Sequence, residues 1–268
     1  MTAAVRDTPV RTPLWRGLDQ VPADVGPSVV TIGVFDGLHR GHRRLVEHAR
    51  WIADERGLPL VLLTFDPHPA RVLGLARDTA TLTTVEHRAE LAGAAGVDAV
   101  CALTFTRELA GLSPDAFARR VLAGALGASA VVVGANFTFG ARAAGDLTAL
   151  HRLGADLGFT VHGVPLLQAV GTPCSSTYAR RRLRAGDLDA ATRALGRPHR
   201  VDGDRSGDHV ELPADTALPP PGRYVGTVDG RAAVVEVTGA DALRIDGGPT
   251  GDGPVAVTFH AGADERCP

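Results

Sequence analysis

The stretch TIGVFDGLHRGHRRL, residues 31–45, places a strand, a glycine-rich turn and a helix start in immediate succession. The apolar run Ser28–Val34 predicts a buried strand, and the amphipathic run Arg40–Arg56 predicts a helix. Three glycines border or separate these two elements: Gly33, Gly37 and Gly41. Glycine lets the backbone approach a ligand closely, and the N–H groups at a helix start favour anions. The stretch therefore predicts a turn that binds an anion such as a triphosphate.

Two histidines lie at the predicted helix start. His39 and His42 are three residues apart, so they share one helix face and are able to point at one phosphate. A bare pair with this spacing is more often an ordinary surface feature. The preceding strand and the clustered glycines favour the phosphate-binding interpretation instead. A zinc site is disfavoured, because no third ligand follows at a suitable spacing.

Short apolar strands alternate with helical patterns from residue 28 to about residue 200. Further strands are predicted at Leu60–Phe65, Asp98–Thr104, Ala130–Val133 and Phe159–Val164. Further helices are predicted after the capping residues Thr83 and Ser113 and at Leu147–Leu157, Ser176–Ala185 and Leu188–Leu195. This alternation predicts an α/β fold, a Rossmann-like parallel sheet with helices on both faces. Ligands bind beyond the carboxyl ends of such strands, so functional residues are expected directly after strands.

The chain changes character after Pro198, where it becomes rich in glycine, proline and aspartate. Short alternating runs occur at Tyr224–Val228, Ala232–Val237, Ala242–Ile245 and Val255–Phe259. They predict a small antiparallel β unit of low stability or a partly ordered tail.

The composition argues against several classes of function. With 28 basic against 30 acidic residues the formal net charge is −2, which disfavours nucleic-acid binding through bulk electrostatics. All the basic residues are arginine, so the sequence offers no lysine for a Schiff base or a Walker A loop. The three cysteines form no CxxC pair, and no apolar signal region or membrane-spanning run is visible. We expect a cytoplasmic protein without membrane or nucleic-acid partners, of undetermined oligomeric state.

Three later motifs follow residues 31–45 in order: Thr64–Pro69 (TFDPHP), Val131–Gly140 (VVVGANFTFG) and Ser175–Arg180 (SSTYAR). Together with the G-x-F-D-G-x-H-x-G-H run they resemble bacterial FAD synthetases, bifunctional riboflavin kinase/FMN adenylyltransferases with an HxGH nucleotidyltransferase module. The resemblance covers about residues 14–199. It implies transfer of the adenylyl group from ATP to FMN, with Mg²⁺, to give FAD and pyrophosphate.

The resemblance also implies which residues carry the reaction. His39, His42 and Arg180 are the expected catalytic residues, acting as donors to the phosphates of ATP. The expected ATP-binding set is Gly33, Phe35, Gly37, Gly41, Ser176 and Thr177. Ser176 and Thr177 are also good capping residues, which is the better interpretation when SSTYAR is taken alone. The resemblance leaves the metal ligands unidentified.

The implied flavin-binding set is Asp66, Pro67, His68, Phe117, Asn136 and Phe139. Asn136 and Phe139 follow a predicted strand, where an amide can hydrogen-bond a phosphate or the ring edge and a phenyl ring can stack on isoalloxazine. We assign Phe137 to the core, and core packing is also the stronger expectation for Phe117. A rigid turn explains Asp66 equally well.

Residues 1–199 are expected to form the nucleotidyltransferase domain, and residues 200–268 a truncated kinase-like β remnant or a partly ordered tail. The run Glu211–Thr216 (ELPADT) resembles a degenerate copy of the G-x-P-T-A-N run that opens the family's riboflavin kinase barrel. The remaining chain is too short for the full barrel, so we expect no riboflavin kinase activity. Two alternatives stay open. One is a nucleotidyltransferase for another nucleotide triphosphate or a modified flavin phosphate, and the other is a catalytically silent flavin-nucleotide-binding protein.

Overall fold

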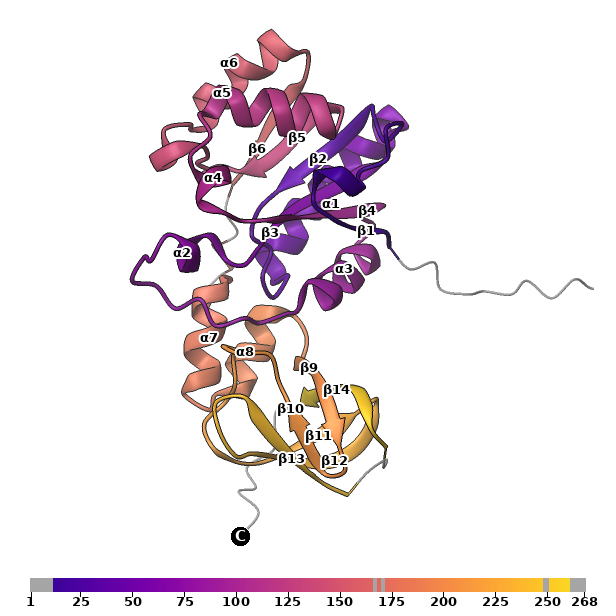
Figure 1. Ribbon diagram of the computed structural model, residues 1–268, viewed down its shortest axis with the longest axis vertical. Coiled ribbons are helices and arrows are strands. Elements are labelled where there is room, and N and C mark those ends of the chain that lie inside the picture. The colour runs from indigo at the N-terminus through magenta and orange to yellow at the C-terminus, as the bar shows by residue number, and fades with distance from the viewer. Residues whose placement is uncertain (1–11, 166–167, 170–171, 248–250, 261–268) are drawn as a thin grey trace, which may run out of the picture.

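A six-stranded parallel sheet and a closed barrel make up the protein, with two helices between them (Figure 1). The computed structural model describes residues 12–165, 168–169, 172–247 and 251–260. No helix in these ranges is long and apolar enough to cross a membrane.

The sheet has the strand order β1-β4-β3-β2-β5-β6, and every neighbouring pair is parallel. Its strands are β1 (Leu14–Arg16), β2 (Ser28–Ile32), β3 (Leu60–Asp66), β4 (Ala99–Thr104), β5 (Ala128–Gly134) and β6 (Thr160–Val164). The predicted Rossmann-like α/β fold is confirmed. The three-residue edge strand β1 was not predicted, because it is too short to show a period.

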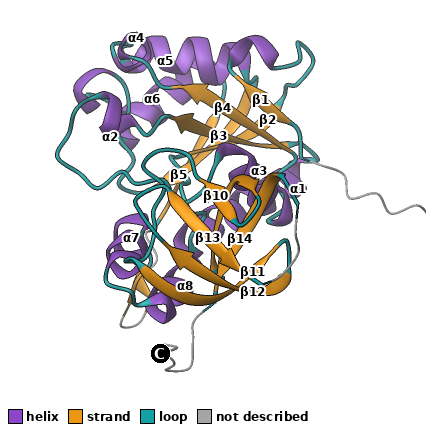
Figure 2. Ribbon diagram, turned by 60° about the horizontal axis from the view of Figure 1, so that its bottom comes forward, coloured by secondary structure: helices purple, strands orange, loops and turns teal. Residues whose placement is uncertain are grey.

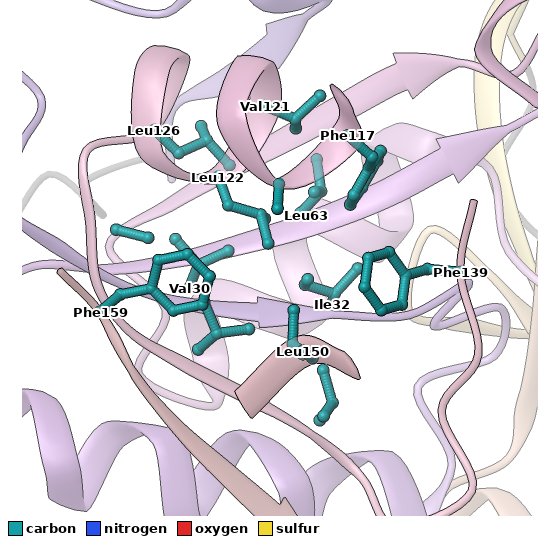
Figure 3. Packing of buried hydrophobic residues seen from close by; sticks show 14 of the residues in the cluster. Val30, Ile32, Leu63, Phe117, Val121, Leu122, Leu126, Phe139, Leu150 and Phe159 are labelled. Atoms are coloured by element: carbon teal, nitrogen blue, oxygen red, sulfur yellow. The ribbon is translucent and has the colours of Figure 1, made fainter. Parts of the chain in front are cut away.

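Helices cover both faces of the sheet. One face carries α1 (Arg40–Arg56) and α3 (Val85–Ala94); the other carries α5 (Pro114–Phe117), a π-helix (Ala118–Ala125) that continues it, and α6 (Leu147–Leu157). Val30 and Ile32 of β2 pack with Leu122 and Leu150 on the second face (Figure 3), whereas Val29 packs on the first. Complete burial of such a side chain stabilises the fold by about 1.5–3 kcal/mol.

The connections set the place of the site. From β2 the chain runs to β3 and β4 on one side of the sheet, whereas β5 is followed by β6 on the other side. The order therefore reverses between the neighbours β2 and β5, and ligands bind beyond the carboxyl ends of the strands at such a reversal. The loops after Ile32 and Gly134 both begin there.

Two capping predictions have different outcomes. Ser113 caps its helix as predicted, accepting a hydrogen bond from the N–H of Ala116. The cap of α3 is Thr84 rather than Thr83. Adjacent threonines give the same sequence signal, and Thr83 turns its hydroxyl toward Gly37 instead.

The C-terminal unit is a closed barrel, so the expectation that the chain is too short for one was wrong. Its order is β10-β13-β12-β11-β14-β9 (Figure 2). The strands are β9 (His199–Ser206), β10 (His209–Glu211), β11 (Gly222–Val228), β12 (Arg231–Val237), β13 (Ala242–Asp246) and β14 (Gly253–Phe259). The strand β9 closes the ring by pairing with both β14 and β10. Its sequence HRVDGDRS is too polar to have been predicted as a strand.

Helices α7 (Ser176–Arg184) and α8 (Leu188–Leu195) link the two units, after a short hairpin of β7 (Gln168–Ala169) and β8 (Thr172–Pro173). Leu183 and Leu195 of these helices share a buried cluster with Val201, Val235 and Phe259 of the barrel. Four short helices complete the described elements: Leu18–Gln20, α2 (Pro69–Val72), α4 (Arg107–Ala110) and Ala141–Ala143.

Candidate active site

His39 and His42 stack at the N-terminus of α1. Their ring centroids are 3.6 Å apart and the planes differ by 22°. His39 is the N-cap of the helix, and its Nδ1 accepts a hydrogen bond from the backbone N–H of His42 at 3.3 Å. In the neutral ring the proton then lies on Nε2. His39 therefore presents one N–H donor at the helix start.

Both rings are neutral at pH 7. Burial lowers the pKa of His39 to about 4, and the charges of Arg180 and Arg197 lower it further while Asp36 opposes them. Burial also lowers the pKa of His42 well below its ordinary value, assisted by His39. The His42 Nδ1 atom is buried and has no hydrogen-bond partner among the described residues. Neutral N–H donors suit a site that binds a negatively charged ligand.

We predict that stability falls as the pH drops from about 6.5 toward 4. Burial lowers the pKa of His39 and His199 to about 4 and that of His87 to about 3, each from 6.5. The unfolded chain therefore binds more protons in this window, so this stability is complete above pH 6.5 and is lost on acidification. Urea unfolding at pH 7, 6, 5 and 4 measures the effect. A His199→Gln variant should show a shallower slope, and constant stability between pH 7 and 5 would contradict the prediction.

The loop before the histidines is held by a buried carboxylate that the sequence analysis did not single out. Asp36 is 3% exposed and accepts hydrogen bonds from the N–H groups of Leu82 and Thr83 and from the Thr83 hydroxyl. Phe35, directly before Asp36, and Leu38, two residues after it, have φ of 52° and 33°, and both side chains are buried in the core. Such backbone strain persists only where the surroundings hold it in place.

Arg180 lies beneath this loop rather than beside open space. The side chain is 2% exposed, and its guanidinium donates to the Asp36 carboxylate at 2.5 Å, the Ala80 carbonyl at 2.6 Å and the Asp78 carbonyl at 3.1 Å. All three nitrogens are thus engaged within the protein. Arg180 therefore lies under the loop of residues 33–38, where it holds Asp36 and its charge lowers the pKa of His39.

A second buried arginine joins this network. Arg88 is 2% exposed; it donates to the Thr64 hydroxyl at 2.8 Å and lies 3.8 Å from the Asp36 carboxylate. The sequence does not reveal these pairings, because the Arg88–Thr64 hydrogen bond spans 24 positions and the Arg180–Asp36 hydrogen bond spans 144.

The N-terminus of α7 meets the N-terminus of α1. Ser175 caps α7, and the Ser176 hydroxyl donates to the backbone carbonyl of Asp36 at 2.8 Å, while Thr177 is exposed. A side chain at Gly41 would come within 3.1 Å of the Cys174 carbonyl and of the His39 ring, so glycine permits this close approach. Two helix N-termini with positive dipole ends therefore converge near the histidines.

The remaining predicted ATP-binding residues, Gly33, Phe35 and Gly37, belong to the same loop. Gly33 donates its N–H to the Leu63 carbonyl at 3.1 Å, and a Cβ there would press on the Phe35 ring. Phe35 itself is fully buried, and its ring meets the edge of His42 at 5.0 Å. Gly37 has φ of 78° and donates to Thr83. Phe35 and Gly37 therefore shape the loop.

The predicted flavin residues after β3 lie near this loop. Asp66 is exposed, Pro67 is partly buried, and His68 caps α2 by accepting from the N–H of Ala70 at 3.1 Å. Burial and the charge of Arg180 lower the pKa of His68. Like His39, His68 therefore carries its proton on Nε2 and presents a neutral donor.

The exposures of Phe137 and Phe139 are the reverse of the prediction, which assigned Phe137 to the core and Phe139 to the flavin. Phe139 is 7% exposed and Phe117 is 5% exposed, and both belong to the core beneath the sheet face (Figure 3). Phe137 is only partly buried and stacks on Phe139 with centroids 5.6 Å apart. The exposed Asn136 precedes it. Phe137 is therefore more accessible than Phe139.

Comparison with known proteins decides the family. The sequence profile described as FAD synthetase matches residues 21–178, more than half of the chain. The chain belongs to the FAD synthetase family. Relatives in this family carry the name bifunctional riboflavin kinase/FMN adenylyltransferase: one from Pseudomonas fluorescens is 38% identical, one from Listeria monocytogenes 34% and one from Escherichia coli 33%.

These FAD synthetase relatives are longer than the matched region. The matches cover 71%, 76% and 86% of this chain, but 61%, 64% and 74% of the respective relatives. A solved structure described as a macrolide-efflux protein from Streptococcus pneumoniae has the same fold, with a TM-score of 0.76 and 23% identity over 93% of this chain and 90% of that one.

Within the described ranges no three His, Cys, Asp or Glu side chains are grouped so that they could hold a metal ion. Asp36, the carboxylate nearest the histidines in the network above, already accepts from four donors.

Proposed function

We propose that this chain transfers the adenylyl group of ATP to FMN, giving FAD and pyrophosphate. The observation that carries the proposal is the meeting of the His39–His42 pair with the N-termini of α1 and α7 at the carboxyl ends of β2 and β5. This arrangement supplies neutral N–H donors and two helix dipoles to one anion. Membership of the FAD synthetase family supports the substrates.

The chemistry requires positioning rather than a base. A phosphate oxygen of FMN, already anionic, attacks the α-phosphorus of ATP; the new P–O bond forms as the bond to the β-phosphate oxygen breaks and pyrophosphate leaves. The Nε2–H of His39, together with His42, donates to the phosphate oxygens as charge shifts toward pyrophosphate. Thr177 and the free N–H groups of the first turn of α7 hold the phosphate tail. We propose that Mg²⁺ enters bound to ATP, in which case it would supply positive charge to the pyrophosphate as that group leaves.

The flavin side of the site is proposed at solvent-accessible residues after β3 and β5. His68 offers a neutral donor and Asn136 an amide, both suited to the FMN phosphate. Phe137, rather than the buried Phe139, is the accessible ring for stacking on isoalloxazine. Asp66 and Pro67 shape the turn that carries His68.

We further propose that the barrel has no riboflavin kinase activity, although the relatives are named as bifunctional. The first three residues of the degenerate run, Glu211–Pro213, line a pocket of about 680 Å³ between the start of α3 and the barrel strands β9 and β14. Among the described residues that line it, one is an arginine, Arg200, and five are carboxylates: Glu86, Asp202, Asp204, Glu211 and Asp229. Arg16 pairs with Glu86 and Arg200 with Asp202, which leaves the carboxylates of Asp204, Glu211 and Asp229 in excess. This charge opposes binding of a nucleotide triphosphate.

One assay tests both proposals. Purified protein is incubated with Mg²⁺ and ATP plus either FMN or riboflavin, and the products are resolved by mass. We expect FAD from FMN, and neither FMN nor FAD from riboflavin. A product from another nucleotide triphosphate or a modified flavin phosphate would replace the proposed substrates, and binding without turnover would indicate a silent flavin-nucleotide-binding protein. FMN or FAD formed from riboflavin would refute the loss of the kinase. We propose a cytoplasmic location, as expected for these substrates.

A further inference from the structure

The degenerate run in the barrel pairs with a segment of the nucleotidyltransferase unit. Thr81 donates its N–H to the Asp215 carbonyl at 2.7 Å and accepts from the N–H of Ala217 at 2.9 Å. These two bonds form a parallel bridge between Thr81 and Thr216. The run singled out in the sequence thus uses its backbone to hold residues 78–83, which we call the 78–83 segment.

The same segment holds Asp36 from its other side. The N–H groups of Leu82 and Thr83, directly after Thr81, donate to the Asp36 carboxylate at 3.0 Å. The Thr83 hydroxyl donates to Asp36 and accepts from the N–H of Gly37. Leu82, with 2% of its surface exposed, belongs to the barrel's own buried cluster. One stretch of backbone therefore contacts both the barrel and the phosphate-binding loop.

Arg180 closes the arrangement. It donates to the carbonyls of Ala80 and Asp78 at one end of the 78–83 segment and to Asp36 at the other. Asp36 in turn accepts the Ser176 hydroxyl through its backbone carbonyl. Displacement of the 78–83 segment would withdraw donors from Asp36 and move the supports of both helix N-termini at once.

We propose that the barrel positions the active-site loop: residues 215–217 fix the 78–83 segment, which fixes Asp36 and so places His39 and Ser176 for adenylyl transfer. This inference rests on the proposed function. Thr81, Asp36 and Ala217 are positioning residues, because they act through other groups. The strained residues Phe35 and Leu38 explain why the loop needs such support. A barrel without kinase chemistry would then keep a role in the first reaction.

The test perturbs the barrel far from the phosphates, in the full-length chain. Ala217→Pro removes the N–H that bonds Thr81. Thr216→Ala is milder and removes the hydroxyl bond to the Pro213 carbonyl that closes the turn. Its matched control is Thr238→Ala, which removes an equivalent bond to the Ala242 carbonyl in another barrel turn. Each variant is assayed for kcat and for the KM of ATP, and hydrogen exchange is followed in peptides covering residues 78–83.

We expect Ala217→Pro to lower kcat by about 20-fold or more and Thr216→Ala by about 3- to 10-fold, since small displacements of positioned groups cost large factors in rate. KM for ATP should change less than kcat, and exchange in the 78–83 segment should be about tenfold faster. Thr238→Ala should match the wild type. If Ala217→Pro does not fold, the Thr216→Ala and Thr238→Ala pair decides.

Equal kcat values in Thr216→Ala and Thr238→Ala, both folded, would overturn the inference. Unchanged exchange at residues 78–83 in the barrel variants would overturn it independently of any activity. Failure of the wild type to form FAD would refute the proposed function instead, and the exchange measurement would still decide whether the barrel holds the segment.

Discussion

Replacing His39 with asparagine is expected to lower kcat for FAD formation by about 10²- to 10³-fold, the usual effect of removing one donor to a developing charge. Asparagine is among the best N-cap residues, so α1 keeps its cap while the imidazole Nε2–H disappears. The steady-state rate of FAD formation from ATP and FMN measures the loss, and the melting temperature should stay close to that of the wild type.

Two companion variants make this result interpretable. His39→Ala loses both the donor and the cap, so it should match His39→Asn in turnover but be less stable by about 1 kcal/mol. His42→Ala should keep the fold and lose most of its turnover, because the ring stacks on His39 at the same helix start. Retention of more than a third of wild-type turnover by His39→Asn would remove His39 from the mechanism.

Asp36→Asn is expected to destabilise the protein by about 3–5 kcal/mol, the range observed when one partner of a buried ion pair is removed. The variant leaves the positive charge of Arg180, and that of nearby Arg88, without a carboxylate at an almost fully buried position. It also replaces an acceptor of four hydrogen bonds by an amide with one oxygen. Urea unfolding at pH 7 measures the difference.

Asp115→Asn is the matched control, because Asp115 pairs with Arg119 one turn away on the surface. About half of each of those side chains is exposed, so solvent screens the pair and its loss should cost about 1 kcal/mol or less. A similar free energy of unfolding for the two variants would show that the Asp36 network is not a main support of the fold.

Much of the α/β unit was predictable because its signals are local. The continuous apolar run of β2 and the amphipathic period of α1 gave the site its frame, and α1 begins and ends where the pattern predicted. The position of His39 and His42 followed from the same stretch, since residues three or four positions apart are neighbours on a helix face.

The other features of the fold and the site depend on contacts between residues, which a local sequence pattern does not reveal. Asp36 and Arg180 lie 144 positions apart, so the pairing that occupies Arg180 could not be read from SSTYAR. The alternation of buried and open positions in β9 is masked by the polar residues Asp202, Asp204 and Arg205. Phe137 and Phe139 are the same residue type two positions apart, so the sequence does not distinguish them. In the structure the Phe139 ring packs against both Phe117 and Phe137.

The edge strands of the sheet determine where folded copies of the protein would pair with one another at high concentration. The barrel is a closed ring, and one margin of the parallel sheet is the three-residue β1. The opposite margin is the five-residue strand β6, which pairs with β5 on one side and has no strand on its other side in the part of the chain that the structure describes. Strand-to-strand aggregation by the folded form would therefore start at β6, where a charged substitution of Thr160 is the natural way to raise solubility.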